Sequence, residues 1–492
     1  MDTSPRSGPD LAPEAREGAP VSAAETPAAG TPVTDAPAAE APAPHGWRIA
    51  PTTLAWIIVS LAALFYTYEF ALRIVPSVME EELMANFKIL AGGFGLLSAA
   101  YYFVYTPMQL PVGMLMDIFG PRRLLTSATL VCAVGIFLFA ATDVLGIAVV
   151  GRCLMGLGSA FAFIGAMKLA AIWFPPHRFA LFSGLISSLG MVGAMVGDNT
   201  LAVMVTDLGW RETCYTLGIL GVVLGVAIGL VVHDRPPEGY HVPQHHSVDT
   251  SVRVLWISFW KVASRAQTWK TGLAGSIMFL PISVIGSLWG PPLMESIDPG
   301  MPLVEATAVT TMVFLGYALG SPAIGHLSDH FRNRKLPMVI GSIGATASFA
   351  TLVLMPGLPV WLMYVLSFLT GLFGSAQALV FVAGREANRA DAAGTTIAMV
   401  NMLVTFGGML FQPIVGYLLQ WQQATYGGAV TQGAEVFYTA EQFRWAILPI
   451  IVLMVLNILL VFWIKETRAR QHYLHPHSHP RHADDEEEER VA

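Results

Sequence analysis

Residues 113–123 read GMLMDIFGPRR, and residues 325–335 read GHLSDHFRNRK. Both share the pattern G-x-L-x-D followed by a cluster of basic residues. Each comes directly after an apolar stretch that is long enough to cross a membrane, which takes about 20 residues. A pattern that recurs at corresponding places predicts two related halves of the chain.

Each position of the pattern has a local physical interpretation. Gly113 and Gly325 would let neighbouring helices approach closely. The aspartates would cap the N-terminus of an adjacent helix. Arg122 and Arg123 would hold their loop on the cytoplasmic side of the membrane.

The composition around the two copies is that of a membrane protein. Hydrophobic residues make up 54% of the 492 residues and charged residues only 12%, whereas soluble domains carry about 25% charged residues. This excludes an ordinary soluble enzyme. Twelve spans are predicted: 53–74, 93–115, 124–142, 145–171, 179–204, 213–233, 272–292, 305–326, 336–354, 359–383, 394–420 and 443–464.

Lys and Arg placement predicts the orientation, because cytoplasmic loops are enriched in both. With the N-terminus inside, the inner loops hold nearly all basic loop residues, and the outer loops keep Lys88, Arg211 and Arg444. We therefore expect a multi-pass protein of the cell membrane, a bacterial inner membrane, with both termini in the cytoplasm.

The apolar pattern divides the chain into five parts. We expect a disordered Pro/Ala-rich cytoplasmic tail over 1–50, a six-helix bundle over 51–233, a cytoplasmic linker over 234–271, a second six-helix bundle over 272–464, and a His/acidic cytoplasmic tail over 465–492. The linker segment 252–261 is amphipathic and carries Trp residues. It is either an interfacial helix or a linker helix packed under the bundle.

The doubled pattern resembles the loop signature G-x-L-x-D-x-x-G-x-R-R of the major facilitator superfamily, and the resemblance covers about residues 50–465. Residues 152–156, of the form R-x-x-x-G, are similar to another element of that family. The resemblance implies an all-α fold of twelve transmembrane helices in two pseudo-symmetric six-helix bundles, with alternating access. It also implies a gating role for the motif residues Gly113, Asp117, Arg122, Arg123, Gly325 and Asp329. The second copy departs from the signature, since Arg332 stands where glycine would.

Residues 65–79, FYTYEFALRIVPSVM, are similar to a bacterial branch near the lysosomal dipeptide transporters and, more distantly, the organic-anion carriers. This resemblance implies a small polar solute as the cargo.

Charged residues within spans are costly and indicate function. Arg152 is the leading substrate-binding candidate, since a guanidinium offers fixed donors for a carboxylate or phosphate; the alternative is a structural pair with Glu69 or Asp198. Glu69 and Arg73, four residues apart, would bind substrate or simply pair, and Arg73 could instead snorkel outward. Lys168 is a further substrate contact or a snorkelling residue. Asp198 is interpreted as solvated at the interface.

Three polar side chains complete the predicted substrate site. Tyr66 shares the face of Glu69 and either lines the cavity or packs as an aromatic. Gln377 and Asn401 supply polar contacts from the second half, or else join helices by hydrogen bonds. Glu69 is also the candidate proton carrier.

The sequence thus predicts a secondary active transporter of a small anionic or zwitterionic solute, a dipeptide or an organic or phosphorylated acid, coupled to protons or to exchange. It contains no phosphate-binding loop for ATP, no enzymatic constellation, no cofactor or metal site, and no sign of nucleic-acid binding. The partners are the solute, protons and the lipid bilayer, with a tail-bound protein as a further option. The alternative is a non-transporting membrane sensor or assembly subunit with the transporter fold.

Overall fold

The computed structural model describes residues 51–174, 179–236, 252–389, 392–427, 430–432 and 435–467. The predictions for the tail over 1–50, and for all but the first three residues of the tail over 465–492, lie outside the described residues.

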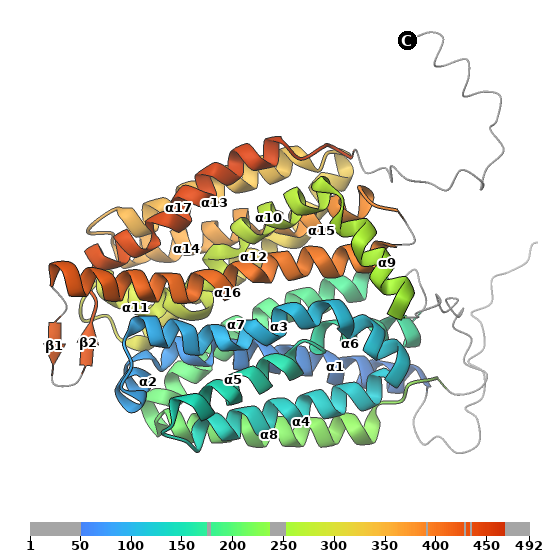
Figure 1. Ribbon diagram of the computed structural model, residues 1–492, viewed down its shortest axis with the longest axis horizontal. Coiled ribbons are helices and arrows are strands. Elements are labelled where there is room, and N and C mark those ends of the chain that lie inside the picture. Colours follow the sequence, from blue (N-terminus) through green and yellow to red (C-terminus); the bar gives the residue numbers. More distant parts are fainter. Residues whose placement is uncertain are drawn as a thin grey trace, which may run out of the picture. The chain divides into compact units, whose positions relative to one another are not determined.

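The first half of the chain is helical throughout its described part (Figure 1). Its elements are α1 (Pro51–Ile74), the 3₁₀ helix η1 (Val75–Val78), α2 (Glu80–Phe87), α3 (Ala91–Phe119), α4 (Pro121–Ala140), α5 (Leu145–Ser159), α6 (Ala162–Trp173), α7 (Phe179–Leu208) and α8 (Trp210–Val231).

The second half repeats this arrangement and adds a small antiparallel hairpin. Its elements are α9 (Val252–Ala263), α10 (Ala266–Leu280), the π-helix η3 (Pro281–Trp289), α11 (Gly290–Ile297), α12 (Leu303–His330), α13 (Lys335–Leu354), α14 (Val360–Gly374), the 3₁₀ helix η4 (Ser375–Ala378), α15 (Leu379–Glu386), α16 (Ala393–Tyr426), β1 (Val430–Gln432), β2 (Glu435–Phe437) and α17 (Ala440–Phe462).

Twelve spans result when consecutive pieces are joined. Eleven described helices or helix runs are long and apolar enough to cross a membrane, and α3 gives the twelfth when it is taken with α2, from which it turns by 106°. The fold class and the number of spans are confirmed. The seventh span begins at Ala266 rather than at 272, because Thr268 and Thr271 face the protein interior and are fully buried. The predicted linker is therefore shorter at its C-terminal end.

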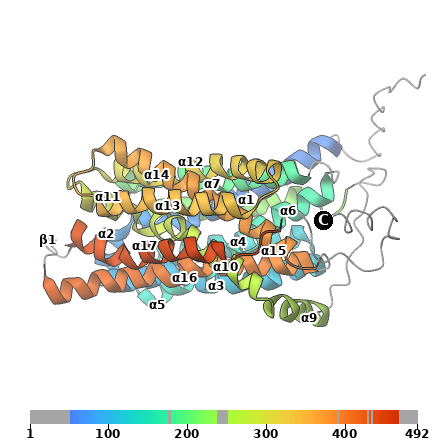
Figure 2. The same cartoon turned by 90° about the horizontal axis from the view of Figure 1, so that it is seen from above.

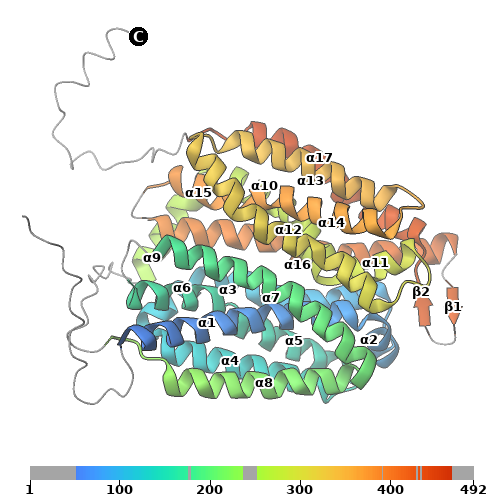
Figure 3. The same cartoon turned by 180° about the vertical axis from the view of Figure 1, so that it is seen from behind.

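The two halves meet along two helix pairs. α3 packs on α16, and α7 packs on α12; Figure 3 shows α7 lying between α1 and α12. Glycines permit the close approach of α3 and α16, since a Cβ on Gly95 would lie 2.6 Å from the carbonyl oxygen of Gln412 and one on Gly416 would collide with that of Ala91. Small residues at such crossings are what membrane helices use to pack.

The bundle has two distinct ends. The hairpin β1–β2, α2 and α11 lie at one end, here called the hairpin end, and α9 lies at the opposite end, here called the α9 end (Figure 2). At the hairpin end the halves also touch through η1 with η3 and α11, and through α2 with β2.

Helix α9 has one packed face and one exposed face. Val262 is 1% exposed and belongs to a small apolar cluster with Ala392, Met399 and Leu403, whereas Ile257 and Trp260 are 44% and 57% exposed. The packed face agrees with a linker helix under the bundle, and the interfacial position stays a prediction.

Candidate functional site

A buried ion pair lies in α1. Arg73 Nε donates a hydrogen bond of 3.0 Å to Glu69 Oε1, and Arg73 Nη2 donates to the same oxygen. Tyr101 of α3 donates to that oxygen too, at 2.5 Å. Glu69 is fully buried and Arg73 is 4% exposed. The prediction that the two residues pair is confirmed, and the snorkelling alternative for Arg73 is wrong.

The guanidinium of Arg73 is surrounded by aromatic rings. Its central carbon lies 4.6 Å from the ring centroid of Phe70 and 4.8 Å from that of Tyr105, and Tyr101 and Tyr102 follow at 5.7 and 5.8 Å. The faces of these rings stabilise a cation that has left water. The three tyrosines are not among the residues predicted from the sequence, although the run YYFVY over 101–105 within an apolar span is an available signal.

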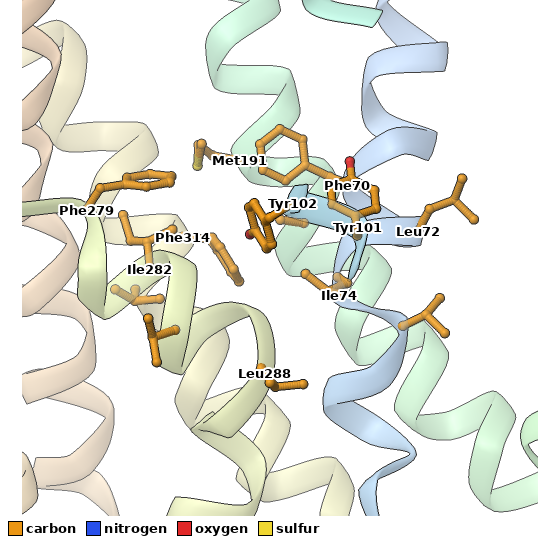
Figure 4. Close-up of a cluster of buried hydrophobic side chains, with 14 of the residues drawn as sticks. Phe70, Leu72, Ile74, Tyr101, Tyr102, Met191, Phe279, Ile282, Leu288 and Phe314 are labelled. Atoms are coloured by element: carbon orange, nitrogen blue, oxygen red, sulfur yellow. The ribbon is translucent and has the colours of Figure 1, made fainter. Parts of the chain in front are cut away.

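These rings lie against the second half of the protein. Figure 4 shows Phe70, Tyr101 and Tyr102 opposite Phe279, Ile282 and Phe314. The Tyr102 ring reaches α16 and η3: a Cβ on Gly408 would lie 3.3 Å from Tyr102 Cζ and 3.1 Å from Ser283 Cβ. The ion pair is thus separated from the second half by one layer of aromatic side chains.

Several buried polar atoms at this junction have no hydrogen-bond partner within the described residues. They are Thr106 Oγ1 and Gln109 Nε2 of α3, Ser283 Oγ of η3 and Gln412 Oε1 of α16, together with Glu69 Oε2. Most buried polar atoms in proteins are paired. Each of these unpaired atoms is a candidate contact for a polar solute or for water.

Arg152 of α5 is fully buried and binds backbone carbonyls rather than a carboxylate. Its Nη1 donates to Leu72 O at 2.8 Å, and its Nη2 lies 3.4 Å from Arg73 O and 3.3 Å from Ser98 O. Leu72 O needs such a donor, because the residue four positions on is Pro76, which has no N–H. The suggested pairing with Glu69 or Asp198 is wrong, and substrate binding by Arg152 stays a prediction.

Three further candidates occupy separate positions. Tyr66 is 9% exposed and packs edge-on against Phe70 at 5.1 Å. Gln377 accepts a hydrogen bond of 2.5 Å from Tyr317 within the second half. Asn401 donates to Gln109 Oε1 at 3.0 Å and thereby joins α16 to α3 across the halves.

The loop after α3 is held by two acidic residues. Lys168 of α6 forms an ion pair with Asp117, at the α9 end and away from Arg73. Asp234, beyond α8, accepts a hydrogen bond of 2.7 Å from the backbone N–H of Arg122, whose side chain donates to Gly229 O. Arg123 is exposed.

The loop after α12 repeats these interactions with different residues. Glu466, beyond α17, accepts hydrogen bonds from the backbone N–H groups of Arg334 and Lys335. Arg334 pairs with Asp329 and with Glu386. Partial burial lowers the pKa of the Arg334 guanidinium, but the hydrogen bonds to Glu386 and Asp329 outweigh it and raise that pKa above its usual value. Arg332 adopts φ 47°, and Gly120 adopts φ 80° at the same place in the first copy.

Two expectations about these loops are wrong. A Cβ on Gly113 or Gly325 would meet nothing within 4 Å, so these glycines do not permit a close helix contact here. The aspartates Asp117 and Asp329 bind basic side chains, and the residues that cap the following helices are Asp234 and Glu466. The capping residues lie more than 100 positions away in sequence, which is why the local pattern did not reveal them.

The chain matches a family model described as Major Facilitator Superfamily over residues 55–306 and 271–484. A curated relative, the uncharacterized transporter YybO of Bacillus subtilis (strain 168), is 24% identical over 393 residues, which are 75% of this chain and 88% of that protein. The probable sulfoacetate transporter SauU of Cupriavidus necator is 25% identical over 37% of this chain and 42% of its own length. The probable galactarate/D-glucarate transporter GudP of Bacillus subtilis is 25% identical over 36% and 40%.

Solved structures agree on the fold. A bacterial homolog of the human lysosomal transporter Spinster, in an inward-facing and occupied conformation, has a TM-score of 0.67 at 15% identity and covers 83% of this chain and 96% of its own. The nucleoside transporter NupG has a TM-score of 0.64 at 13% identity, with 84% and 99% covered.

Proposed function

Because the chain belongs to the major facilitator superfamily, whose members are transporters and not enzymes, we propose that it moves a small organic anion across the membrane by alternating access, together with a proton. Arg73 and the tyrosines around it form the anion site, and Glu69 carries the proton.

The main support for this proposal is the charge balance between Arg73 and Glu69. A guanidinium held out of water needs a counter-ion, and Arg73 has Glu69 for that purpose. When Glu69 takes up a proton, its negative charge disappears and an anionic solute becomes the counter-ion of Arg73. Proton and anion then bind together, as symport requires.

The surroundings suit an anion more than a cation. Arg152, which binds only backbone carbonyls, adds a second positive charge 5.2 Å from the Tyr101 ring, and the unpaired hydroxyl group of Ser283 can donate a hydrogen bond from the other half. The names of the relatives point the same way, since sulfoacetate, galactarate and glucarate are all anions. A dipeptide carries a carboxylate as well, and it belongs in the same substrate screen.

The conformation and orientation form part of the proposal. If the α9 end faces the cytoplasm, as the basic residues of its loops predict, both termini are cytoplasmic. The halves touch at the hairpin end through η1, η3 and α11, so the structure is then closed toward the outside. The membrane is proposed to be the bacterial inner membrane, and cysteine labelling of Ala85 at the hairpin end would test the orientation.

The test is uptake by proteoliposomes of labelled sulfoacetate, glucarate and a dipeptide, with and without an inward proton gradient. We expect saturable uptake that the gradient stimulates. Arg73→Lys should reduce it by roughly 10–100-fold, the worth of a hydrogen bond to a charged group. Glu69→Gln should remove the stimulation by the gradient. Arg444→Lys, a half-buried arginine at the hairpin end, is the matched control.

Unchanged uptake by Arg73→Lys, or an equal effect of the gradient on Glu69→Gln, would overturn the proposal. Binding of a solute without any flux would favour the alternative of a sensor with the transporter fold.

A further inference from the structure

A second carboxylate lies inside the first half, on α7. Asp198 is fully buried, with 0% of its surface exposed, so its interpretation as a residue solvated at the interface is wrong. Its neighbour Asn199 donates a hydrogen bond of 2.8 Å to Thr311 of α12, across the two halves. Asp198 therefore lies on α7, whose packing on α12 is one of the two helix pairs along which the halves meet.

If Asp198 is ionised, the single hydrogen of the Ser77 hydroxyl faces two acceptor oxygens. The Ser77 hydroxyl oxygen lies 2.7 Å from Ile74 O and 2.9 Å from Asp198 Oδ1. A serine hydroxyl has one hydrogen to donate, and neither of these two oxygens carries a hydrogen if Asp198 is ionised. Both contacts become hydrogen bonds when Asp198 Oδ1 carries a proton and donates it to Ser77, which in turn donates to Ile74 O.

Among the residues that the structure describes, no cation pairs with Asp198. On α1, Arg73 is engaged by Glu69. On α8, Arg211 pairs with Asp143, and Cys214 is a buried thiol. The remaining charged or titratable groups on the packed elements are exposed or lie at the α9 end: Asp207 on α7, Glu212 on α8, Lys168 on α6, and Glu305, His326, Asp329 and His330 on α12. Asp198 Oδ2 has no hydrogen-bond partner among the described residues.

Asp198 thus differs from Glu69 in its environment. Glu69 accepts hydrogen bonds from a guanidinium and a phenol, which suits an ionised carboxylate, whereas Asp198 has one hydroxyl and no positive charge. Its Ser77 contact belongs to η1, which touches η3 and α11 at the hairpin end.

We propose that Asp198 is a proton-binding site, occupied while the hairpin end is closed and emptied when η1 moves away from the second half and admits water. The bound proton removes a charge that this buried position cannot hold and completes the chain from Asp198 through Ser77 to Ile74. Proton occupancy therefore stabilises closure of the hairpin end. This deepens the proposed proton coupling, but it can be tested without any substrate.

The first measurement is infrared spectroscopy of the purified protein in lipid nanodiscs. The wild type should show the C=O stretching band of a protonated carboxyl group at neutral pH. Subtracting the Asp198→Asn spectrum from the wild-type spectrum should leave one such band, free of any contribution from Glu80 and Glu295, and Ser77→Ala should shift its frequency because one hydrogen bond is gone. Asp207→Asn, the same change at an exposed position of α7, is the matched control and should leave the band unchanged.

The second measurement is the distance between spin labels on Ala85 of α2 and Thr425 of α16, both exposed, in a background without the three native cysteines. Raising the pH should lengthen this distance in the wild type and in Asp207→Asn. Asp198→Asn, which is permanently neutral, should show a smaller lengthening than the wild type. Glu80 and Glu295 at the same end are present in every variant, so their titration contributes equally to each.

The proposal is overturned if the wild-type minus Asp198→Asn difference spectrum shows no carboxyl band, or if the label distance in Asp198→Asn follows pH as in the wild type. Neither of these results would contradict the roles proposed for Glu69 and Arg73. Conversely, if the uptake experiment fails, the carboxyl band and the label distance still test the role of Asp198.

Discussion

Replacement of Arg152 by methionine tests whether this arginine holds the fold together or binds the solute. The structure gives it one hydrogen bond of ordinary length, 2.8 Å to Leu72 O, and two longer contacts. Loss of a hydrogen bond to a charged group costs about 1.5–3 kcal/mol. Methionine in turn avoids the cost of burying a charge, so we expect a net loss of about 2 kcal/mol in the free energy of unfolding.

Pro76 provides the check on this reasoning. Pro76→Ala restores the N–H that Leu72 O lacks, so Arg152→Met should cost less in that background, with a coupling energy of about 1 kcal/mol. The assay is the thermal unfolding midpoint in detergent of the wild type, both single variants and the double variant. Arg152→Lys, which keeps one charged donor, should fall between the wild type and Arg152→Met.

Equal destabilisation by Arg152→Met in both backgrounds would refute the role assigned to Pro76. A variant of unchanged stability that no longer takes up solute would instead place Arg152 in the substrate site, as the sequence suggested.

Three other predictions concern local geometry and are measured by the same unfolding assay. Arg332→Gly should stabilise the protein by about 0.5–1 kcal/mol, because its φ of 47° favours glycine. Gly156→Ala should destabilise it by about 1–3 kcal/mol, since the new Cβ would collide with the Tyr101 carbonyl oxygen, whereas Gly113→Ala meets nothing within 4 Å and is its control. Asp234→Ala should cost about 1 kcal/mol through loss of the cap on α4.

Each of these predictions has a clear contrary result. A less stable Arg332→Gly would mean that its side chain contributes more than the backbone strain costs. Equal effects of the two alanine substitutions would contradict the contact described for Gly156. An unaffected Asp234→Ala would show that water replaces the carboxylate at the start of α4.

The overall architecture was predictable because it depends on properties that the chain repeats. Apolar length alone predicts twelve spans, and the doubled G-x-L-x-D pattern predicts two related halves. The i,i+4 pair of Glu69 and Arg73 was also predictable, since it depends on helix geometry within one segment.

The remainder of the site depends on contacts between distant segments. Tyr101 and Tyr105 belong to the site because the fold brings Arg73 of α1 next to them; their own segment shows an aromatic run but not the cation that it surrounds. Arg152 was expected to face a carboxylate, because the sequence does not show that Pro76 leaves a carbonyl group free nearby. Asp198 was misplaced for a similar reason: its position near the end of a span predicts solvent, but η1 and α12 cover it.

The caps on α4 and α13 also bear on where the chain can be shortened or extended. Glu466 binds the start of α13, and Thr467, which is 1% exposed, donates a hydrogen bond to Glu386. Both residues follow the last transmembrane helix and would be regarded from sequence as the beginning of a dispensable tail. A truncation or an affinity tag placed after Thr467 preserves these bonds. A chain cut at Ile464 would keep every membrane span but would lose the hydrogen bonds of Glu466 to α13 and of Thr467 to Glu386.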